Sequence, residues 1–334
     1  MRFSRTNLAL WALLAPVLLA GCRTARASGP AVNGAATPGT AVMRVYDTKA
    51  SGWVRFEDMV AAAAKADMVF LGEQHDDPVT HSLELAVLAA LGERRPRVVL
   101  SLEMFERDVQ PLLDAYLAGT MPEQKFLADS RPWDRYATDY RPLVELAHVR
   151  GWPVVASNVP RRIASGVSRR GLAYLDSLNP SERAFAAAQH SCPKDRYFEL
   201  FTATMSGHGG GAAPAAGAGG SATSASTSAA DAAVARSIIE RYYQAQCVKD
   251  EAMGEAVATA FLRDGKRSIV LHVDGAFHSD FGLGTAERAR RRVPDAKTVV
   301  LTAVPVTELS AADVAPHRSK GDYIVFTLAP RKSP

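Results

Sequence analysis

The stretch Asp67-Met-Val-Phe-Leu71, followed by the polar segment Gly72-Glu-Gln-His-Asp-Asp77 and by Pro78, decides the fold class. A short β-rich run that is apolar at almost every position is typical of a strand covered on both faces. Asp77 then supplies an N-cap and Pro78 the first position of a helix, whose apolar residues recur up to Gly92. The sequence therefore predicts a buried strand, a polar turn and a helix in immediate succession.

The same alternation continues along the chain. Further strands are predicted at 97–102, 153–156, 268–273, 297–302 and 322–327. The segment Asn179-Pro-Ser-Glu182 resembles a capping box that opens a helix toward Met205. Asp231 is placed to cap a second, long helix that ends before Gly265. This pattern predicts an α/β fold with an open, largely parallel sheet flanked by helices, and a helical hairpin over the carboxyl ends of the strands.

Low-complexity segments set the expected domain boundaries. Residues 22–40 are mostly small and polar, with Pro and Gly, which is typical of a flexible tether. The α/β domain is expected over 41–330, with the helical hairpin at 179–264. Inside the hairpin, residues 207–230 are nearly all Gly, Ala, Ser and Thr, and such a segment buries too little apolar surface to order itself. We therefore expect a disordered surface insertion that joins the two helices.

The N-terminus resembles a lipoprotein signal peptide. Arg2 and Arg5 precede an apolar run from Leu8 to Ala20, and small residues lead directly to Cys22. This order of charge, apolar core and small residues is typical of secretory signals, and the core is too short for a stable membrane span. Residues 1–21 are therefore expected to be removed and Cys22 to carry a lipid.

Two further inferences concern this leader. The alternative is an ordinary signal peptide cleaved near Ala25-Arg26-Ala27. If the cell is Gram-negative, Arg23 favours the outer membrane, because an Asp there would indicate retention at the inner membrane. The sequence thus predicts an exported protein, lipid-anchored to the outer membrane on its periplasmic or surface face.

Charge and cysteine content narrow the remaining possibilities. Loss of Arg2 and Arg5 with the signal lowers the formal net charge from +4 to +2, which gives no argument for nucleic-acid binding. Beyond Cys22 two cysteines remain, Cys192 and Cys247, and such a pair predicts a disulfide in an oxidising compartment. Two buried free thiols are the alternative.

Polar residues gather where the predicted strands end, and these carry the candidate chemistry. They are Glu73, His75, Glu103, Asn158 and His278. In an open parallel sheet, ligands bind beyond the carboxyl ends of the strands, so we expect these side chains to share one edge. Glu73, His75 and His278 would suit a divalent metal, and the same groups would suit general acid–base catalysis. The alternative is that these groups cap helices and bond to loop backbone.

The predicted hairpin is rich in aromatic residues and methionine. Tyr197 and Tyr243 are its candidate haem ligands, because a flat apolar ligand needs an aromatic wall and haem iron accepts tyrosine as an axial ligand. At helical spacing, such residues more often form a core stripe. The sequence does not choose between the two tyrosines.

Ordered blocks of sequence resemble the ChaN family of haem-binding lipoproteins. They are Leu71-Gly-Glu-Gln-His-Asp-Asp77, Leu102-Glu-Met-Phe105, Pro132-Trp133, Ala156-Ser-Asn-Val-Pro160, Tyr243-Gln-Ala-Gln246 and Gly275-Ala-Phe-His278. The resemblance implies an α/β fold, haem as cofactor, a homodimer and a haem receptor as partner. It also implies a wider group with Tiki-type peptidases and erythromycin-esterase-type hydrolases, whose active site corresponds here to Glu73, His75 and His278. The insertion at 207–230 departs from the family pattern within the region expected to contact haem.

The sequence is consistent with three functions. The first is a haem-binding protein for iron acquisition, and the second is a hydrolase that uses Glu73, His75, Glu103 and His278 with or without a metal. The third is a structural envelope lipoprotein with a vestigial site. The sequence offers no nucleophile elbow and no H-E-x-x-H helix, so haem binding is favoured and enzymatic activity is left open.

Overall fold

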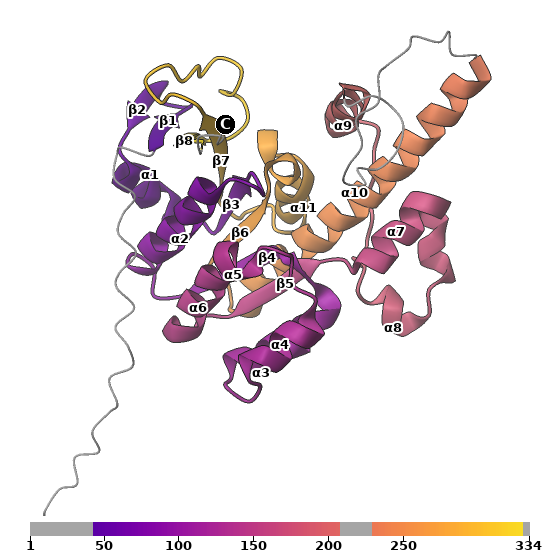
Figure 1. Ribbon diagram of the computed structural model, residues 1–334, viewed down its shortest axis with the longest axis horizontal. Helices are drawn as coiled ribbons and strands as arrows, with labels where there is room; N and C mark the ends of the chain where they lie inside the picture. Colours follow the sequence, from indigo (N-terminus) through magenta and orange to yellow (C-terminus); the bar gives the residue numbers. More distant parts are fainter. Residues whose placement is uncertain (1–42, 208–228, 330–334) are drawn as a thin grey trace, which may run out of the picture. The chain divides into compact units, whose positions relative to one another are not determined.

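The computed structural model describes residues 43–207 and 229–329, and Figure 1 shows its helices and strands. Its strands form one eight-stranded sheet in the order β2-β1-β8-β7-β3-β6-β4-β5. Their bounds are β1 (Met43–Asp47), β2 (Gly52–Val54), β3 (Met68–Glu73), β4 (Val98–Glu106), β5 (Val154–Asn158), β6 (Ile269–Gly275), β7 (Thr298–Val306) and β8 (Tyr323–Leu328). From β8 to β5 every neighbouring pair is parallel, so the predicted α/β fold with a largely parallel sheet is confirmed.

The six predicted strands are all present, and two more precede them. The short strands β1 and β2 pair with each other antiparallel, and β1 also pairs antiparallel with β8. This antiparallel edge was not predicted from the sequence. β1 alternates buried and half-buried residues over only five positions, which is a weak local signal.

Helices cover both faces of the sheet. Their bounds are α1 (Phe56–Ala63), α2 (Pro78–Gly92), α3 (Gln110–Leu117), α4 (Glu123–Ser130), α5 (Tyr136–Asp139), α6 (Arg141–Arg150), α7 (Arg161–Arg170), α8 (Pro180–Arg183), α9 (Arg196–Gly207), α10 (Ala229–Arg263) and α11 (Gly284–Arg292). In β3, Val69 and Leu71 join the core under α1, α2 and α6. Met68 and Phe70 point to the other core, under α10 and α11. Alternate residues of one strand therefore fill two cores, which explains its continuous apolar run.

The helix after β3 begins as predicted. The Asp77 carboxylate accepts a hydrogen bond from the backbone N–H of Val79 at 3.0 Å, and Pro78 occupies the first helical position. This cap fixes where the chain leaves β3, because it satisfies a backbone donor that the helix itself cannot pair. The polar loop at 74–77 is thereby held at the carboxyl edge of the sheet.

The predicted extent of the first hairpin helix is wrong. Asn179 caps as expected and accepts from the N–H of Glu182 at 3.0 Å, but α8 ends at Arg183. The next helix, α9, begins only at Arg196, where Asp195 accepts from the N–H of Tyr197 at 2.9 Å. The intervening segment contains Pro193, which lacks a backbone donor and interrupts a helix.

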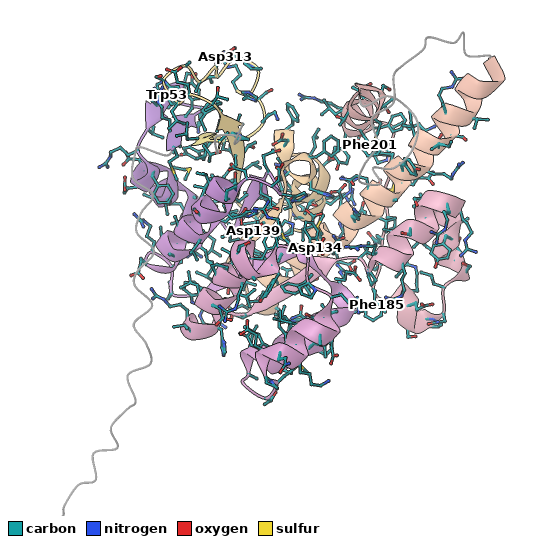
Figure 2. The ribbon with its side chains drawn as sticks, in the orientation of Figure 1. Trp53, Asp134, Asp139, Phe185, Phe201 and Asp313 are labelled. Carbon is teal, nitrogen blue, oxygen red and sulfur yellow. A yellow bond between two sulfur atoms is a disulfide. The ribbon has the colours of Figure 1, made fainter. Side chains whose placement is uncertain are left out.

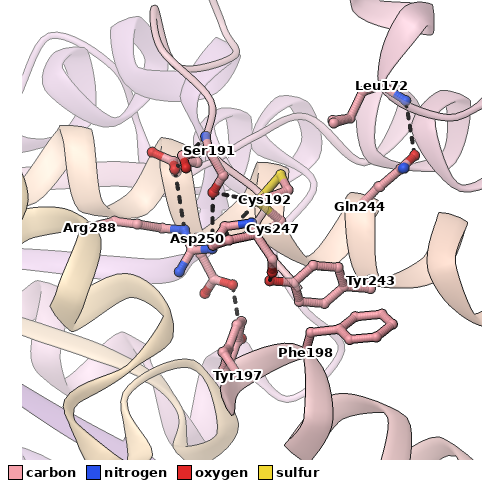
Figure 3. The surroundings of a disulfide bond; sticks show 12 residues. Leu172, Ser191, Cys192, Tyr197, Phe198, Tyr243, Gln244, Cys247, Asp250 and Arg288 are labelled. Atoms are coloured by element: carbon pink, nitrogen blue, oxygen red, sulfur yellow. Dashed lines mark hydrogen bonds and ion pairs between the residues drawn. A yellow bond between two sulfur atoms is a disulfide. The ribbon is translucent and has the colours of Figure 1, made fainter. Parts of the chain in front are cut away.

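A disulfide ties this segment to α10. Cys192 and Cys247 are bonded, with a sequence separation of 55, so the predicted pair is present (Figure 3). Cys247 is fully buried on α10. The cross-link therefore anchors the approach to α9 on the long helix, and α9 and α10 are the two members of the hairpin that reach the carboxyl ends of the strands.

Several predictions fall outside the described residues. They concern the signal peptide at 1–21, the lipid on Cys22, the tether at 22–40 and nearly all of the insertion at 207–230. Over the ranges that are described, no helix is long and apolar enough to cross a membrane.

Candidate functional site

The end of β3 delivers Glu73 and His75 to the edge of the sheet. Glu73 is almost fully buried, and its Oε1 accepts a hydrogen bond from the Tyr140 hydroxyl at 2.8 Å. The same oxygen pairs with Nδ1 of His75, whose side chain is 48% exposed. A carboxylate on one ring nitrogen fixes the orientation and tautomer of an imidazole, so Glu73 positions His75.

The end of β6 lets His75 approach the sheet closely. A Cβ placed on Gly275 would lie 2.8 Å from both Cε1 and Nε2 of His75, which is closer than real contacts allow. The N–H of Gly275 also donates to Oε2 of Glu103 at 2.8 Å. Gly275 therefore gives the imidazole room beside the β4 carboxylate.

His278 follows β6 in the short 3₁₀ turn Ala276–His278, and it has two acidic partners. Its Nδ1 lies 2.7 Å from Oδ1 of Asp250 on α10, and its Nε2 lies 3.3 Å from Oε1 of Glu103. Asp250 also accepts from the Tyr197 hydroxyl at 2.8 Å and from Oγ1 of Thr285 at 3.0 Å. The hairpin thus contributes a carboxylate that completes the environment of His278.

These residues form one arrangement, which we name the strand-end cluster and define as Glu73, His75, Glu103, Asp250 and His278. Each histidine pairs through Nδ1 with its own carboxylate, His75 with Glu73 and His278 with Asp250. Glu103 acts electrostatically on both imidazoles. Two oriented imidazoles beside a buried carboxylate are the groups that acid–base catalysis or a divalent metal requires.

Electrostatic interactions within the cluster favour the charged forms of His278, Glu103 and Glu73. Burial opposes the charged form of His278, but Glu103 and Asp250 outweigh it and raise its pKa to about 10. Burial would likewise raise the pKa of Glu103, yet His278 holds it well below its usual range. The pKa of Glu73 falls to about 2 despite burial, because His75 and His81 favour its ionised form. The imidazole of His278 and the carboxylates of Glu103 and Glu73 therefore favour opposite charges within a buried part of the cluster.

A second group of titratable residues lies behind Glu73. Ligand atoms of Glu73, His81 and Glu84 all lie within 4.8 Å of one another, and all three residues are buried. Despite burial, the carboxylates of Glu73 and Glu84 raise the pKa of His81 to about 10. Burial and the neighbouring Glu73 raise the pKa of Glu84. In the described ranges this is the trio that satisfies the spacing for a metal site, and the trio Glu73, His75 and His278 predicted from the sequence does not.

The remaining predicted site residues lie at different places. Asn158 ends β5 and is buried, and its Oδ1 has no hydrogen-bond partner among the described residues. Tyr197 and Tyr243 are each only 1% exposed. Their hydroxyls donate to Asp250 at 2.8 Å and to the carbonyl of Pro193 at 2.7 Å, respectively, as drawn in part in Figure 3. Both tyrosines therefore pack inside the hairpin in this structure.

Sequence reasoning missed four members of this region as site residues. They are Asp250, Tyr140, His81 and Glu84. Asp250 lies four residues after Gln246 on one helical face, and the Gln246 amide nitrogen lies 3.2 Å from Nδ1 of His278. That spacing is a detectable signal for a polar face, but nothing in the sequence alone indicates which histidine this face meets.

A pocket of about 520 Å³ adjoins the cluster at His75. Trp133 and Tyr140 contribute aromatic surface to its lining, and Arg131, Arg135 and Arg161 contribute cations. Its volume lies within the usual range for small-molecule sites. The exposed side of His75 thus borders a cavity that is large enough for a ligand.

Comparison with known proteins places this site in a family. A family profile described as "Haem-binding uptake, Tiki superfamily, ChaN" matches residues 59–289. Among solved structures, one described as cofacial haem binding to ChaN of Campylobacter jejuni is similar, with a TM-score of 0.60 and 16% identity over 86% of this chain and 97% of that one. A structure of the type III effector HopBA1 has a TM-score of 0.42 and 11% identity over 81% of this chain and 92% of that one. No curated protein matches the sequence. The profile covers more than half of the chain and includes the whole strand-end cluster, and on that evidence the chain belongs to the ChaN family of haem-binding uptake proteins in the Tiki superfamily.

Proposed function

We propose that this chain is an exported lipoprotein that binds haem for iron acquisition. The observation that carries the proposal is membership of the haem-binding uptake family over residues 59–289. The fold supports it, because it is shared with ChaN of Campylobacter jejuni, whose structure is described as binding haem. The leader sequence supports export, since residues 1–21 and Cys22 have the order of a lipoprotein signal.

The anchor and the partners belong to the same proposal. A lipid on Cys22 would hold the protein at the outer membrane, on the periplasmic or the surface face. A homodimer and a haem receptor stay predictions. Each is tested directly, the first by the mass of the purified protein in solution and the second by capture with haem-loaded protein.

The residues that would hold haem can be tested against the structure. Haem supplies an iron that takes an axial protein ligand, and Tyr197 and Tyr243 are the candidates from the sequence. Both side chains are buried and their hydroxyls already donate hydrogen bonds, to Asp250 and to the carbonyl of Pro193, so ligation of iron through either requires these contacts to open. The pocket at His75, in contrast, is open and has an aromatic lining that suits a porphyrin edge.

The test is a haemin titration of the chain from residue 23 onward, followed by absorption spectroscopy. Tyr197→Phe and Tyr243→Phe are titrated in parallel. A saturable spectrum with tyrosinate character that is lost in one variant supports the proposal and identifies the ligand. Adsorption without saturation refutes haem binding.

A second function, hydrolysis of an ester or peptide bond, is favoured by the strand-end cluster itself. His278 is held between Asp250 and Glu103, and His75 is oriented by Glu73 with an exposed edge. Acid–base chemistry by these groups needs no metal, and in the described ranges neither His75 nor His278 belongs to a group whose ligand atoms lie close enough together to hold one. Under this hypothesis His75→Ala abolishes turnover of ester or peptide substrates while haem affinity carried by the tyrosines is retained. Loss of haem binding alone contradicts that assignment.

A further inference from the structure

The pocket beside His75 has features that the strand-end cluster does not use. We name it the Trp133 pocket; its lining includes His75, Arg131, Trp133, Arg135, Tyr140 and Arg161. Its residues come from the loop after β3, from the segment that leads into α5 and α6, and from the start of α7. It therefore lies where the polypeptide leaves the parallel strands β3 and β5, and the carboxyl ends of such strands are the usual position of a ligand.

One wall of the Trp133 pocket is aromatic. The Trp133 ring meets the His75 ring edge to face, with centroids 5.0 Å apart, and it meets the Tyr140 ring at 6.0 Å. Trp133 is only partly buried, so part of its ring remains available to a ligand. A flat, largely apolar molecule would be accepted against such a surface.

The cations of the pocket are not equivalent. Arg131 is neutralised by Glu106 at 3.1 Å and Asp108 at 2.7 Å. Arg135 is neutralised by Asp139 at 2.7 Å. Asp134, labelled in Figure 2, is a further lining residue of the same pocket.

Arg161 is the cation without a counter-charge. It has no hydrogen bond or ion pair with any residue in the described ranges. It is also the first residue of α7, whose first turn contains no acidic side chain. The positive end of a helix dipole disfavours a cation, and the neighbouring Arg162 is compensated by Asp108 at 2.7 Å. Arg161 has no such compensation, so an anion bound in the pocket would offset the repulsion between its guanidinium and the positive end of the α7 dipole.

We propose that the Trp133 pocket binds the carboxylate-bearing edge of a porphyrin, with Arg161 pairing with a propionate and Trp133 lying against the ring edge. The inference rests on the proposed haem binding and adds the position of the propionate. An arginine recognises a carboxylate through paired N–H donors, and a planar ring complements an aromatic wall.

The experiment compares haemin with its dimethyl ester, in which both propionates lose their charge. The full chain, purified in detergent, is titrated with each probe as wild type and as Arg161→Gln. We expect the ester to bind wild type about 10-fold more weakly than haemin, as for the loss of a charged hydrogen bond. Arg161→Gln should weaken haemin about 10-fold and leave the affinity for the ester unchanged. Arg161 is exposed, so the variant should unfold at the wild-type temperature.

Arg131→Gln is the matched control, because Arg131 lines the same pocket but is already paired with Glu106 and Asp108. It should change haemin affinity much less than Arg161→Gln does. If haemin binds saturably but Arg161→Gln leaves its affinity unchanged, or weakens both probes equally, the assignment of the pocket is overturned and haem binding stands. If haemin does not bind saturably to wild type, both are overturned.

Discussion

Removal of the Cys192–Cys247 disulfide should cost this protein a large part of its stability. The bond closes a loop with a sequence separation of 55. In the chain-entropy treatment, a cross-link of this span restricts the unfolded chain enough to stabilise the folded state by about 4 kcal/mol. The typical net stability of a domain is about 5–15 kcal/mol, so this single bond carries a substantial fraction.

The assay is urea unfolding at equilibrium, for wild type and for the double variant Cys192→Ala, Cys247→Ala. Alanine is used because Cys247 is fully buried and a serine hydroxyl there would lack water. Wild type treated with a reducing agent is the matched control, since it loses the cross-link and keeps the sulfur atoms. The two samples should lose similar free energy, with the difference measuring the small cavity at Cys247.

A loss of less than about 1 kcal/mol in both samples would refute this reasoning. It would mean that the unfolded chain is already restricted over this loop, or that the segment before α9 detaches without unfolding the rest. Hydrogen exchange distinguishes these cases, because local detachment exposes the backbone near Cys192 and leaves α10 protected.

The remaining predictions concern the strand-end cluster. The pKa of His278 is raised to about 10, so its contribution to stability is fully present below about pH 6.5 and is lost as the pH rises through 10. Between pH 7 and pH 9, urea unfolding should show wild type losing about 2–3 kcal/mol more than His278→Gln; equal slopes would contradict the assignment. Gly275→Ala should displace the His75 ring at a cost of less than about 1 kcal/mol, because a half-exposed side chain can move. The pKa of His75, followed by NMR, should then fall as the ring leaves Glu73. Gly72→Ala should lower the thermal unfolding temperature more than Gly275→Ala does, because its Cβ would lie 2.8 Å from the backbone Cα of Ala276, which cannot move aside as a side chain can. A larger loss in Gly275→Ala than in Gly72→Ala would refute this steric account.

Local signals predicted the strands and several helix ends, but not the start of α10, which begins at Ala229 and so contains Asp231, the residue expected to cap it. β3 and α2 lie where they were expected, because an apolar run and an Asp-Pro cap act over a few residues. α10 ends at Arg263, and Gly265 beyond it takes a positive φ of 61°. The helix expected after Asn179 begins there but ends at Arg183, because a cap determines where a helix starts and not how long it continues.

The amino-acid sequence by itself determined the α/β class, the six parallel strands, the disulfide pair and four members of the strand-end cluster, namely Glu73, His75, Glu103 and His278. Periodicity, caps and strand-end position are local properties, and a parallel sheet brings its carboxyl ends to one edge whatever the details of packing. Only the tertiary structure decided that Asp250 pairs with His278 and that Tyr197 and Tyr243 are buried. It also decided that Arg161 borders a pocket and has no ion-pair partner among the described residues. These are contacts between segments far apart in the chain, and their geometry depends on how α9 and α10 pack over the sheet rather than on any short stretch of residues.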